Sequence, residues 1–549
     1  MELKQQIERA INDFKNPDLF EAGINLFKTL GYNTQRQSKL DNPTFHGFYN
    51  DFIDGNDNIP DVEKFKQKAL TSDWQSIEML FQLTESEMSN QGALFSAGKV
   101  DNTIIEAYLF FAIELKETDY SRTKLADITR YLNRVFPMPV MVLFKYGEYL
   151  TLSVIKRRLH KSDESRDVLK KVTLIKDIKI EDPHRAHIEI LFDLSIEKLR
   201  KKHAVTNFVE LDSAWQKTLD SSELNKKFYK ELANWYFWAV QNAEFPDDDE
   251  KNAETRNASS VIRLLTRLIF VWFIKEKGLI PDKLFNKSKL DNILNYKDNS
   301  DSSFYKAVLQ NLFFATLNQE QSKRAFRRKG QNYNVTNLYR YKKLFKIDEI
   351  KILGLFKNIP FLNGGLFECL DKPHSTKKGS HGGDIIIRID GFSDRDDNIL
   401  KVPDFLFFAE EREIDLNEIF GTKNKKYKVK GLINLLNKYK FTIAENTPIE
   451  EEIALDPELL GKVFENLLAS YNPETKTTAR KQTGSFYTPR EIVDYMVDES
   501  LKASLSNLVS KKIDGVSEED IQIGLEILFA YTEEEHAFTK TEVSKVIEA

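Results

Sequence analysis

The order of apolar and polar positions divides the chain into helical and mixed α/β stretches. Residues 1 to about 60 place apolar side chains at helical spacing, with a break at Gly31. The apolar run Tyr108–Lys116 predicts a strand, and a helix opened by Ser121 follows it. Two further runs, Val140–Phe144 and Tyr149–Ile155, are separated by Lys-Tyr-Gly-Glu and predict a hairpin.

The remaining pattern is mainly helical. Helices are predicted from about 200 to 350, short strands and loops from 350 to 420, and helices again from about 425. At about 150 residues per domain, 549 residues suggest three or four folding units. We expect a helical segment over 1–70, an α/β domain over 71–200, a helical connector with short strands over 201–424, and a last helical segment over 425–549.

Composition excludes several classes of protein. Hydrophobic residues make up 41% and aromatics 12% of the chain, which is too apolar for disorder over most of its length. A single cysteine, Cys369, excludes a disulfide framework and a cysteine-based zinc site. The N-terminus does not resemble a signal peptide, and the longest apolar run, Leu268–Ile274, is far short of the roughly 20 residues that span a bilayer. We expect a soluble cytoplasmic protein without a membrane partner.

The net charge is close to neutral, but the charged residues are unevenly distributed along the chain. Lys and Arg total 80 against 85 for Asp and Glu, a net charge of −5, which argues against a nucleic-acid-binding surface over the whole molecule. A basic cluster from Lys323 to Lys346 interleaves cations with tyrosines, a texture that suits contact with a phosphate backbone. A solvated surface explains the same pattern equally well. The candidate DNA-binding residues are Arg324, Arg327, Arg328, Lys329 and Arg340.

Three charged residues around the predicted strand form a candidate catalytic site. Residues two apart on a strand share a face, so Glu114 and Lys116 are predicted to point the same way while Ile113 and Leu115 are buried. Asp101 lies upstream at a distance that a hairpin can close. Asp101 and Glu114 are therefore candidate Mg²⁺ ligands, with Lys116 beside the attacking water.

This β-α-β order resembles the core of the P-D-(D/E)-x-K nuclease superfamily, although no proline precedes Asp101. The resemblance implies Mg²⁺-dependent cleavage of DNA at Asp101, Glu114 and Lys116. Glu78, expected on a preceding helix, is a candidate fourth ligand. A strand edge with ordinary surface charges remains the alternative interpretation.

A second motif, Gly484–Val497, has a glycine-led loop, two aromatics and Thr488-Pro489 at the start of a helix. Free backbone N–H groups at such a helix start can receive a small polar ligand. The apolar positions of the helix predict a buried face, formed by Ile492, Val493, Met496 and Val497.

This motif resembles motif X of adenine-specific DNA methyltransferases, in particular of type IIG restriction–modification enzymes and related phage-defence methylases. The resemblance implies that Phe486, Tyr487, Thr488 and Pro489 border S-adenosylmethionine. Three other strings are similar to the same family: Leu264–Gly278, Pro360–Glu368 and Leu455–Leu468. The predicted fold class is therefore α+β and multidomain, with a P-D-(D/E)-x-K nuclease-like α/β domain, a mainly helical connector and the start of a class I methyltransferase domain.

The chain departs from the family after motif X. The family's glycine-rich cofactor loop and Asn-Pro-Pro-Tyr-type catalytic loop, which holds a flipped adenine, do not occur in the sequence. We therefore expect the N-terminal part of a methylase, from a truncated chain or a split gene, that does not transfer methyl groups alone. Its expected partners are double-stranded DNA and the remainder of the methyltransferase with its target-recognition region. The alternative is a non-catalytic DNA-binding or scaffold module with a degenerate nuclease fold.

Overall fold

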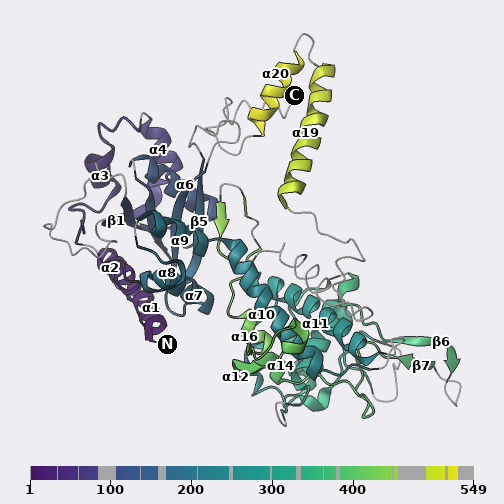
Figure 1. Cartoon of the computed structure of the whole chain (residues 1–549). Helices are drawn as coiled ribbons and strands as arrows, with labels where there is room; N and C mark the ends of the chain where they lie inside the picture. The colour runs from purple at the N-terminus through teal and green to yellow at the C-terminus, as the bar shows by residue number, and fades with distance from the viewer. Residues whose placement is uncertain are drawn as a thin grey trace. The chain divides into compact units, whose positions relative to one another are not determined.

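The structure is a computed structural model of the whole chain (Figure 1). The residues that it describes are 2–33, 35–59, 61–84, 107–136, 138–158, 169–206, 208–246, 252–296, 300–328, 335–362, 364–378, 384–443, 446–447, 450–455, 461, 490–512 and 517–529.

The chain forms two compact units. Unit 1 contains the described residues of Met1–Ser221, Asn446–Ile453 and Phe486–Ala549, and unit 2 those of Ser222–Glu445 and Ala454–Ser485. The N-terminal helices thus belong to the same unit as the sheet that follows them. The helical elements of unit 1 are α1 (Glu2–Asn12), η1 (Asp13–Lys15), α2 (Leu19–Thr29), α3 (Phe45–Phe48), η2 (Tyr49–Ile53), α4 (Val62–Lys68), η3 (Thr71–Asp73), α6 (Arg122–Arg134), α7 (Arg185–Asp193), α8 (Ile196–His203), α9 (Phe208–Thr218), α19 (Arg490–Lys512) and α20 (Glu518–Leu528).

A mixed six-stranded sheet organises unit 1. Its order is β1-β2-β3-β4-β5-β10, and only the β2–β3 and β5–β10 pairs are parallel. Helix α6 is the crossover between β2 and β3, as a parallel connection requires. The strands are β1 (Trp74–Thr84), β2 (Ala107–Leu115), β3 (Val140–Tyr146), β4 (Tyr149–Arg158), β5 (Leu169–Lys179) and β10 (Glu450–Glu452).

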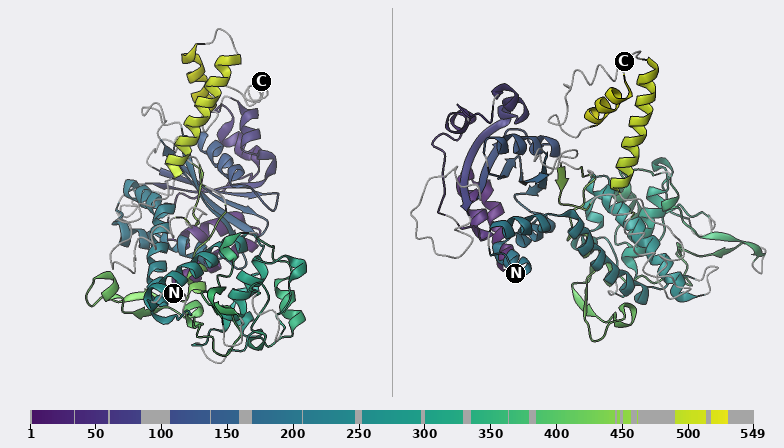
Figure 2. Two further views of the ribbon diagram at one scale, coloured as in Figure 1. Left: turned by 90° about the vertical axis from the view of Figure 1, so that its right-hand side faces the viewer. Right: turned by 45° about the horizontal axis from the view of Figure 1, so that its top comes forward.

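Amphipathic helices cover both faces of this sheet (Figures 1 and 2). On one face, Phe111 and Ile113 of β2 belong to a core with residues of α3, α4 and α6. On the other face, Phe110 lies 4.9 Å from Phe27 of α2, measured between ring centroids, and 6.3 Å from Trp215 of α9. Burial of both faces explains why β2 is apolar at nearly every position instead of alternating.

The strand, the helix and the hairpin predicted between 108 and 155 are confirmed. Ser121 accepts a hydrogen bond from the backbone N–H of Lys124 and begins α6, whose apolar residues Leu125, Ile128 and Leu132 are buried. Strands β3 and β4 pair in antiparallel register through Tyr146 and Tyr149. The broad class, an α+β multidomain chain, is also as predicted.

Strand β10 completes the sheet edge with three consecutive glutamates that are at most 7% exposed. Glu450 accepts a hydrogen bond from Thr123 (3.1 Å) and pairs with Arg122 (3.4 Å) and Arg130 (3.6 Å) of α6. Glu451 pairs with Lys171 of β5 and accepts the backbone N–H of Ser221 at 3.0 Å. Sequence patterns gave no sign of this strand, because three acidic residues have a low strand preference.

Unit 2 is built around α11 (Ala253–Glu276), whose apolar residues belong to a large core. By length and composition alone α11 could cross a membrane, but 67% of its most apolar window is buried inside the protein. The other elements of unit 2 are α10 (Ser221–Asn242), η4 (Asp282–Leu284), α12 (Lys287–Leu290), η5 (Tyr305–Leu317), η6 (Gln321–Lys323), η7 (Lys342–Leu344), α13 (Glu349–Phe356), η8 (Gly365–Phe367), β6 (Lys372–Lys378), β7 (Asp384–Ile387), α14 (Phe405–Phe408), β8 (Arg412–Ile414), α15 (Asn417–Phe420), β9 (Tyr427–Val429) and α16 (Leu432–Leu436).

A buried ion pair joins α11 to the segment that follows β7, and hydrogen bonds from the same arginine reach the segment before β6. The guanidinium of Arg267 lies 2.7 Å from Asp390 and donates to the carbonyls of Leu366 (2.8 Å) and Glu368 (2.9 Å). Two of the strings that resemble the methylase family, Leu264–Gly278 and Pro360–Glu368, therefore meet in unit 2.

Helix α19 corrects one prediction. Ile492, Val493, Met496 and Val497 were expected to be buried, yet they are 43–58% exposed. Helix α20 is the element packed against α19, and its own buried residues are Ile521 and Leu525. The apolar spacing of α19 therefore marks a face that no described residue covers.

We expect Glu450→Ala to destabilise unit 1 by roughly 2–4 kcal/mol, because Arg122 and Arg130 lose a buried carboxylate. The matched control, Glu197→Ala, removes an exposed pair with Lys201 (2.5 Å) and should change the free energy of unfolding by less than about 0.5 kcal/mol. Urea denaturation with hydrogen exchange of the β5 amides measures both. Equal stability of the two variants would contradict the role of β10.

Candidate functional site

Two glutamates lie on the same face of the unit 1 sheet. In the antiparallel β1–β2 pair, Ser76 is opposite Glu114 and Glu78 is opposite Ala112. Directly opposite residues share a face, so Glu78 and Glu114 are diagonal neighbours, with about 7–8 Å between their Cα atoms. Glu78 was expected on a helix, and the structure corrects this: the residue is on strand β1.

Glu78 is a buried glutamate, and only one of its two carboxylate oxygens has a hydrogen-bond partner among the described residues. Its side chain is 6% exposed, and its Oε2 has no hydrogen-bond partner among the described residues. Burial raises the pKa of Glu78 above its ordinary value, although a backbone N–H bond and the nearby charge of Lys39 act against the rise. The ammonium of Lys39 pairs with Asp18 at 3.1 Å. An unpartnered buried carboxylate oxygen is suited to binding a cation.

The ammonium group beside Glu114 belongs to Lys145, which sequence analysis did not single out. Lys145 Nζ lies 2.9 Å from Glu114 Oε1, with side chains 14% and 21% exposed. Lys145 is directly opposite Glu114 in the parallel β2–β3 pair. Only this register brings the two together, and parallel register is not visible in a sequence pattern.

Lys116 has a different contact from the one expected. Its Nζ donates to the carbonyl of Ser72 at 2.6 Å, and its backbone N–H donates to the carbonyl of Asp73 at 2.9 Å. The predicted burial of Ile113 and Leu115 is confirmed, with exposures of 0% and 3%. Lys116 therefore fastens the end of β2 to the turn before β1.

Several candidate residues lie outside the described part of the chain. These are Asp101 of the nuclease-like site, Lys329 of the basic cluster, and the four residues compared with motif X, Phe486, Tyr487, Thr488 and Pro489. Among the residues that the structure describes, no group of three or more His, Cys, Asp or Glu side chains could hold a metal ion. Glu78 and Glu114 are thus two carboxylates on one face of the sheet, fewer than the three candidate ligands of such a group.

The basic cluster is corrected in part. Arg324 donates to the carbonyls of Thr316 (2.8 Å), Phe356 (3.0 Å) and Ile359 (2.9 Å), and burial lowers its pKa. The half-buried Arg324 side chain thus holds together the backbone at the ends of η5 and α13.

The other arginines of the cluster differ from one another. Arg340 is 4% exposed and stacks over the ring of Phe392 at 4.8 Å, so it too is part of the interior of unit 2. Arg327 pairs with Asp394 at 2.7 Å, whereas Arg328 is exposed. Of the four predicted DNA-binding residues that the structure describes, Arg328 is the exposed one, and its placement suits a surface contact.

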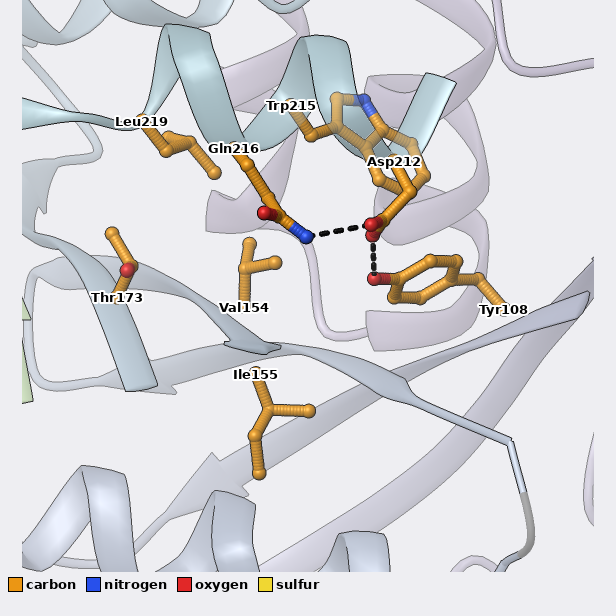
Figure 3. Close-up of a pocket in the computed structure, with 8 residues that line it drawn as sticks. All are labelled: Tyr108, Val154, Ile155, Thr173, Asp212, Trp215, Gln216 and Leu219. Carbon is orange, nitrogen blue, oxygen red and sulfur yellow. Dashed lines mark hydrogen bonds between the residues drawn. The ribbon is translucent and has the colours of Figure 1, made fainter. Parts of the chain in front are cut away.

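A small cavity is lined by residues of α9 and of strands β2, β4 and β5 (Figure 3). Tyr108 donates to Asp212 at 2.5 Å, and Gln216 donates to the second oxygen of Asp212 at 2.6 Å. The cavity has a volume of about 10 Å³, which is room for one water molecule and not for a substrate.

Comparison with known proteins finds sequence similarity over part of the chain. The chain is 26% identical over 331 residues to a protein of Methanocaldococcus jannaschii that is named, provisionally, a type II restriction enzyme and methyltransferase. The match covers 58% of this chain and 21% of that protein's length. No protein-family model matches the chain, and no solved structure matches it.

We expect Arg324→Ala to destabilise unit 2 by roughly 1–3 kcal/mol, because partly buried carbonyls lose a charged donor. Arg328→Ala, the matched control, should leave stability within about 0.5 kcal/mol. It should also lower the slope of log K against log salt for DNA binding by about 0.9. Thermal unfolding and fluorescence anisotropy measure the two effects. An Arg324→Ala protein as stable as the wild type would contradict the carbonyl contacts as a source of stability.

Proposed function

We propose that this chain is part of a type IIG-like restriction–modification or phage-defence protein, and that unit 1 carries its Mg²⁺-dependent DNA endonuclease site. The observation that carries the proposal is the pair Glu78 and Glu114, which lie on one face of a sheet with β-α-β order, together with the unpartnered Oε2 of Glu78. Similarity to a restriction enzyme and methyltransferase supports the same function.

Glu78 and Glu114 would hold Mg²⁺, with Asp101 as the third ligand. When bound, Mg²⁺ supplies polarisation of the phosphate and a bound water with a lowered pKa. The carboxylates position the ion next to the scissile phosphate, and the sheet, covered by helices on both faces, keeps them rigid. An ammonium group in the site stabilises the negative charge that develops on the phosphate oxygens.

The methylation half of the proposal rests on the motif at Gly484–Val497. We propose that Phe486–Pro489 border S-adenosylmethionine in an adenine-specific DNA methyltransferase that the remainder of a methyltransferase completes. The exposed apolar face of α19 supports this proposal, because such a face is suited to packing against another protein surface. The proposed partners are that remainder, with its target-recognition region, and double-stranded DNA.

A second candidate function has an observation in its favour. Glu114 is engaged by Lys145, and Lys116 by a backbone carbonyl, as in a site that no longer binds metal. This arrangement favours a DNA-binding or scaffold module with a degenerate nuclease fold.

Cleavage of unmethylated plasmid DNA with Mg²⁺ separates the two functions. We expect the wild-type chain to cleave, and Glu114→Gln and Asp101→Ala to be at least about 100-fold slower, because each removes a metal-binding charge. The matched control is Glu197→Gln, because Glu197 is exposed and lies far from Glu114 in the sequence. This variant should cleave at the wild-type rate. Equal cleavage by all four proteins would refute the site. DNA binding without cleavage by the wild type would favour the scaffold.

S-adenosylmethionine should bind this chain alone only weakly, with a Kd of about 1 mM or higher. The reason is that the sequence lacks the family's glycine-rich cofactor loop and Asn-Pro-Pro-Tyr-type loop. Isothermal calorimetry measures the affinity. Micromolar binding would show that residues 484–497 and their neighbours already form a complete pocket.

A further inference from the structure

We propose that the end of the β4–β5 hairpin is a DNA-binding element of unit 1, in which cations from both strands contact the phosphates of double-stranded DNA. This end, the basic ribbon, consists of Lys156–Arg158 of β4 and Leu169–Lys171 of β5. The inference rests on the proposed function only in the choice of DNA as the anionic partner. The placement of the charges follows from the register of the two strands.

The basic ribbon extends beyond both strands that flank it in the sheet. On one side, β3 pairs with Tyr149–Val154 of β4. On the other side, β10 pairs with Val172–Leu174 of β5. Lys156–Arg158 pair with Leu169–Lys171 and, among the described residues, with no other strand. The ribbon is thus two strands wide, whereas the sheet behind it has a neighbouring strand on each side.

The register of the basic ribbon places cations opposite cations. Five of its six residues are Lys or Arg, and none is acidic. Arg157 is directly opposite Lys170, and Lys156 is directly opposite Lys171. Successive rows of a strand pair alternate between the two faces, so each face of the ribbon carries cations. Like charges that are directly opposite each other destabilise a strand pair.

One of these cations has a partner within the protein. Lys171 pairs with Glu451 of β10, whose side chain is 4% exposed. In the row of Arg157 and Lys170, by contrast, neither residue has an acidic residue directly opposite it. An acidic residue in either strand would remove the repulsion in this row, and so would anions from outside the protein. The doubly positive row therefore favours an anionic partner.

The shape of the ribbon favours double-stranded DNA as that partner. A two-stranded ribbon is narrow enough to enter the major groove of B-form DNA, which is about 12 Å wide. Phosphates line both walls of that groove, so cations on both faces of a ribbon can be neutralised together. The major groove of double-stranded RNA is deep and narrow and does not admit such an element. Contacts of this kind position unit 1 on the duplex without reading its sequence.

Fluorescence anisotropy of the full chain with a labelled DNA duplex, in EDTA so that Mg²⁺-dependent cleavage does not occur, tests the ribbon. We expect the double variant Arg157→Gln/Lys170→Gln to bind at least about tenfold more weakly at about 0.1 M salt. The slope of log K against log salt should fall by about 1.8, because two phosphate contacts are lost. The matched control, Lys15→Gln/Lys201→Gln, removes two exposed cations of unit 1 that pair with glutamates. It should keep the wild-type affinity and slope.

A charge reversal separates DNA binding from stability. Lys170→Glu places a carboxylate opposite Arg157, so the midpoint of urea unfolding should stay at the wild-type value or rise. DNA affinity should nevertheless fall by more than in Lys170→Gln, because the new carboxylate repels phosphates. A Lys170→Glu protein that is less stable than the wild type would show that the like charges are already compensated within the protein, and would overturn the inference.

Three further results would overturn it: wild-type affinity in the double variant, an equal loss of affinity in the control, or equal affinity of the wild type for DNA and RNA duplexes. The two proposals fail separately. A wild type that binds DNA through the ribbon but cleaves none with Mg²⁺ contradicts the proposed endonuclease and supports the ribbon. A wild type that cleaves DNA, with ribbon variants that bind it equally well, supports the endonuclease and contradicts the ribbon.

Discussion

The parallel pairing of β2 with β3 is the constraint on which the candidate site depends. Parallel strands need a crossover, and α6 supplies it with Ser121 at its start and the Asn133–Val140 hydrogen bond at its end. The register that results puts Lys145 opposite Glu114. A shift by one residue would turn Lys145 into the apolar core on the α6 side, where an ammonium cannot be solvated. The ion pair and the core therefore require the same register.

A second constraint is that unit 1 is closed by a segment far away in the sequence. Strand β10 buries three glutamates, and the carboxylates of Glu450 and Glu451 meet cations on α6 and β5. Because an unpaired buried charge is costly, this edge forms only when α6, β5 and residues 446–453 are all in place. The helix that fixes Lys145 is thus also held by β10.

Local sequence patterns correctly predicted the elements whose structure is determined by residues close together in the sequence. Strand β2, helix α6 and the β3–β4 hairpin follow from apolar runs, a cap and a turn. Glu78 was assigned to a helix because β1 is buried on both faces and lacks alternation. Lys145 was missed because parallel register is a non-local property. Arg324 and Arg340 were expected at a DNA-binding surface because arginines and tyrosines alternate around them. The same sequence pattern arises whether the guanidinium groups bind phosphates or backbone carbonyls of the protein.

The carboxylate of Glu78 favours a binding site over a scaffold. A buried oxygen without a hydrogen-bond partner lowers the stability of the fold by roughly 1–3 kcal/mol. An apolar residue at this position would remove that cost and would add to the apolar packing on the sheet. Glu114 is different, because its ion pair with Lys145 compensates for partial burial. A module that only positions DNA has no use for an oxygen of Glu78 that no described residue hydrogen-bonds. A site that takes up a cation does, since the ion satisfies this oxygen and the apo protein bears the cost until it binds.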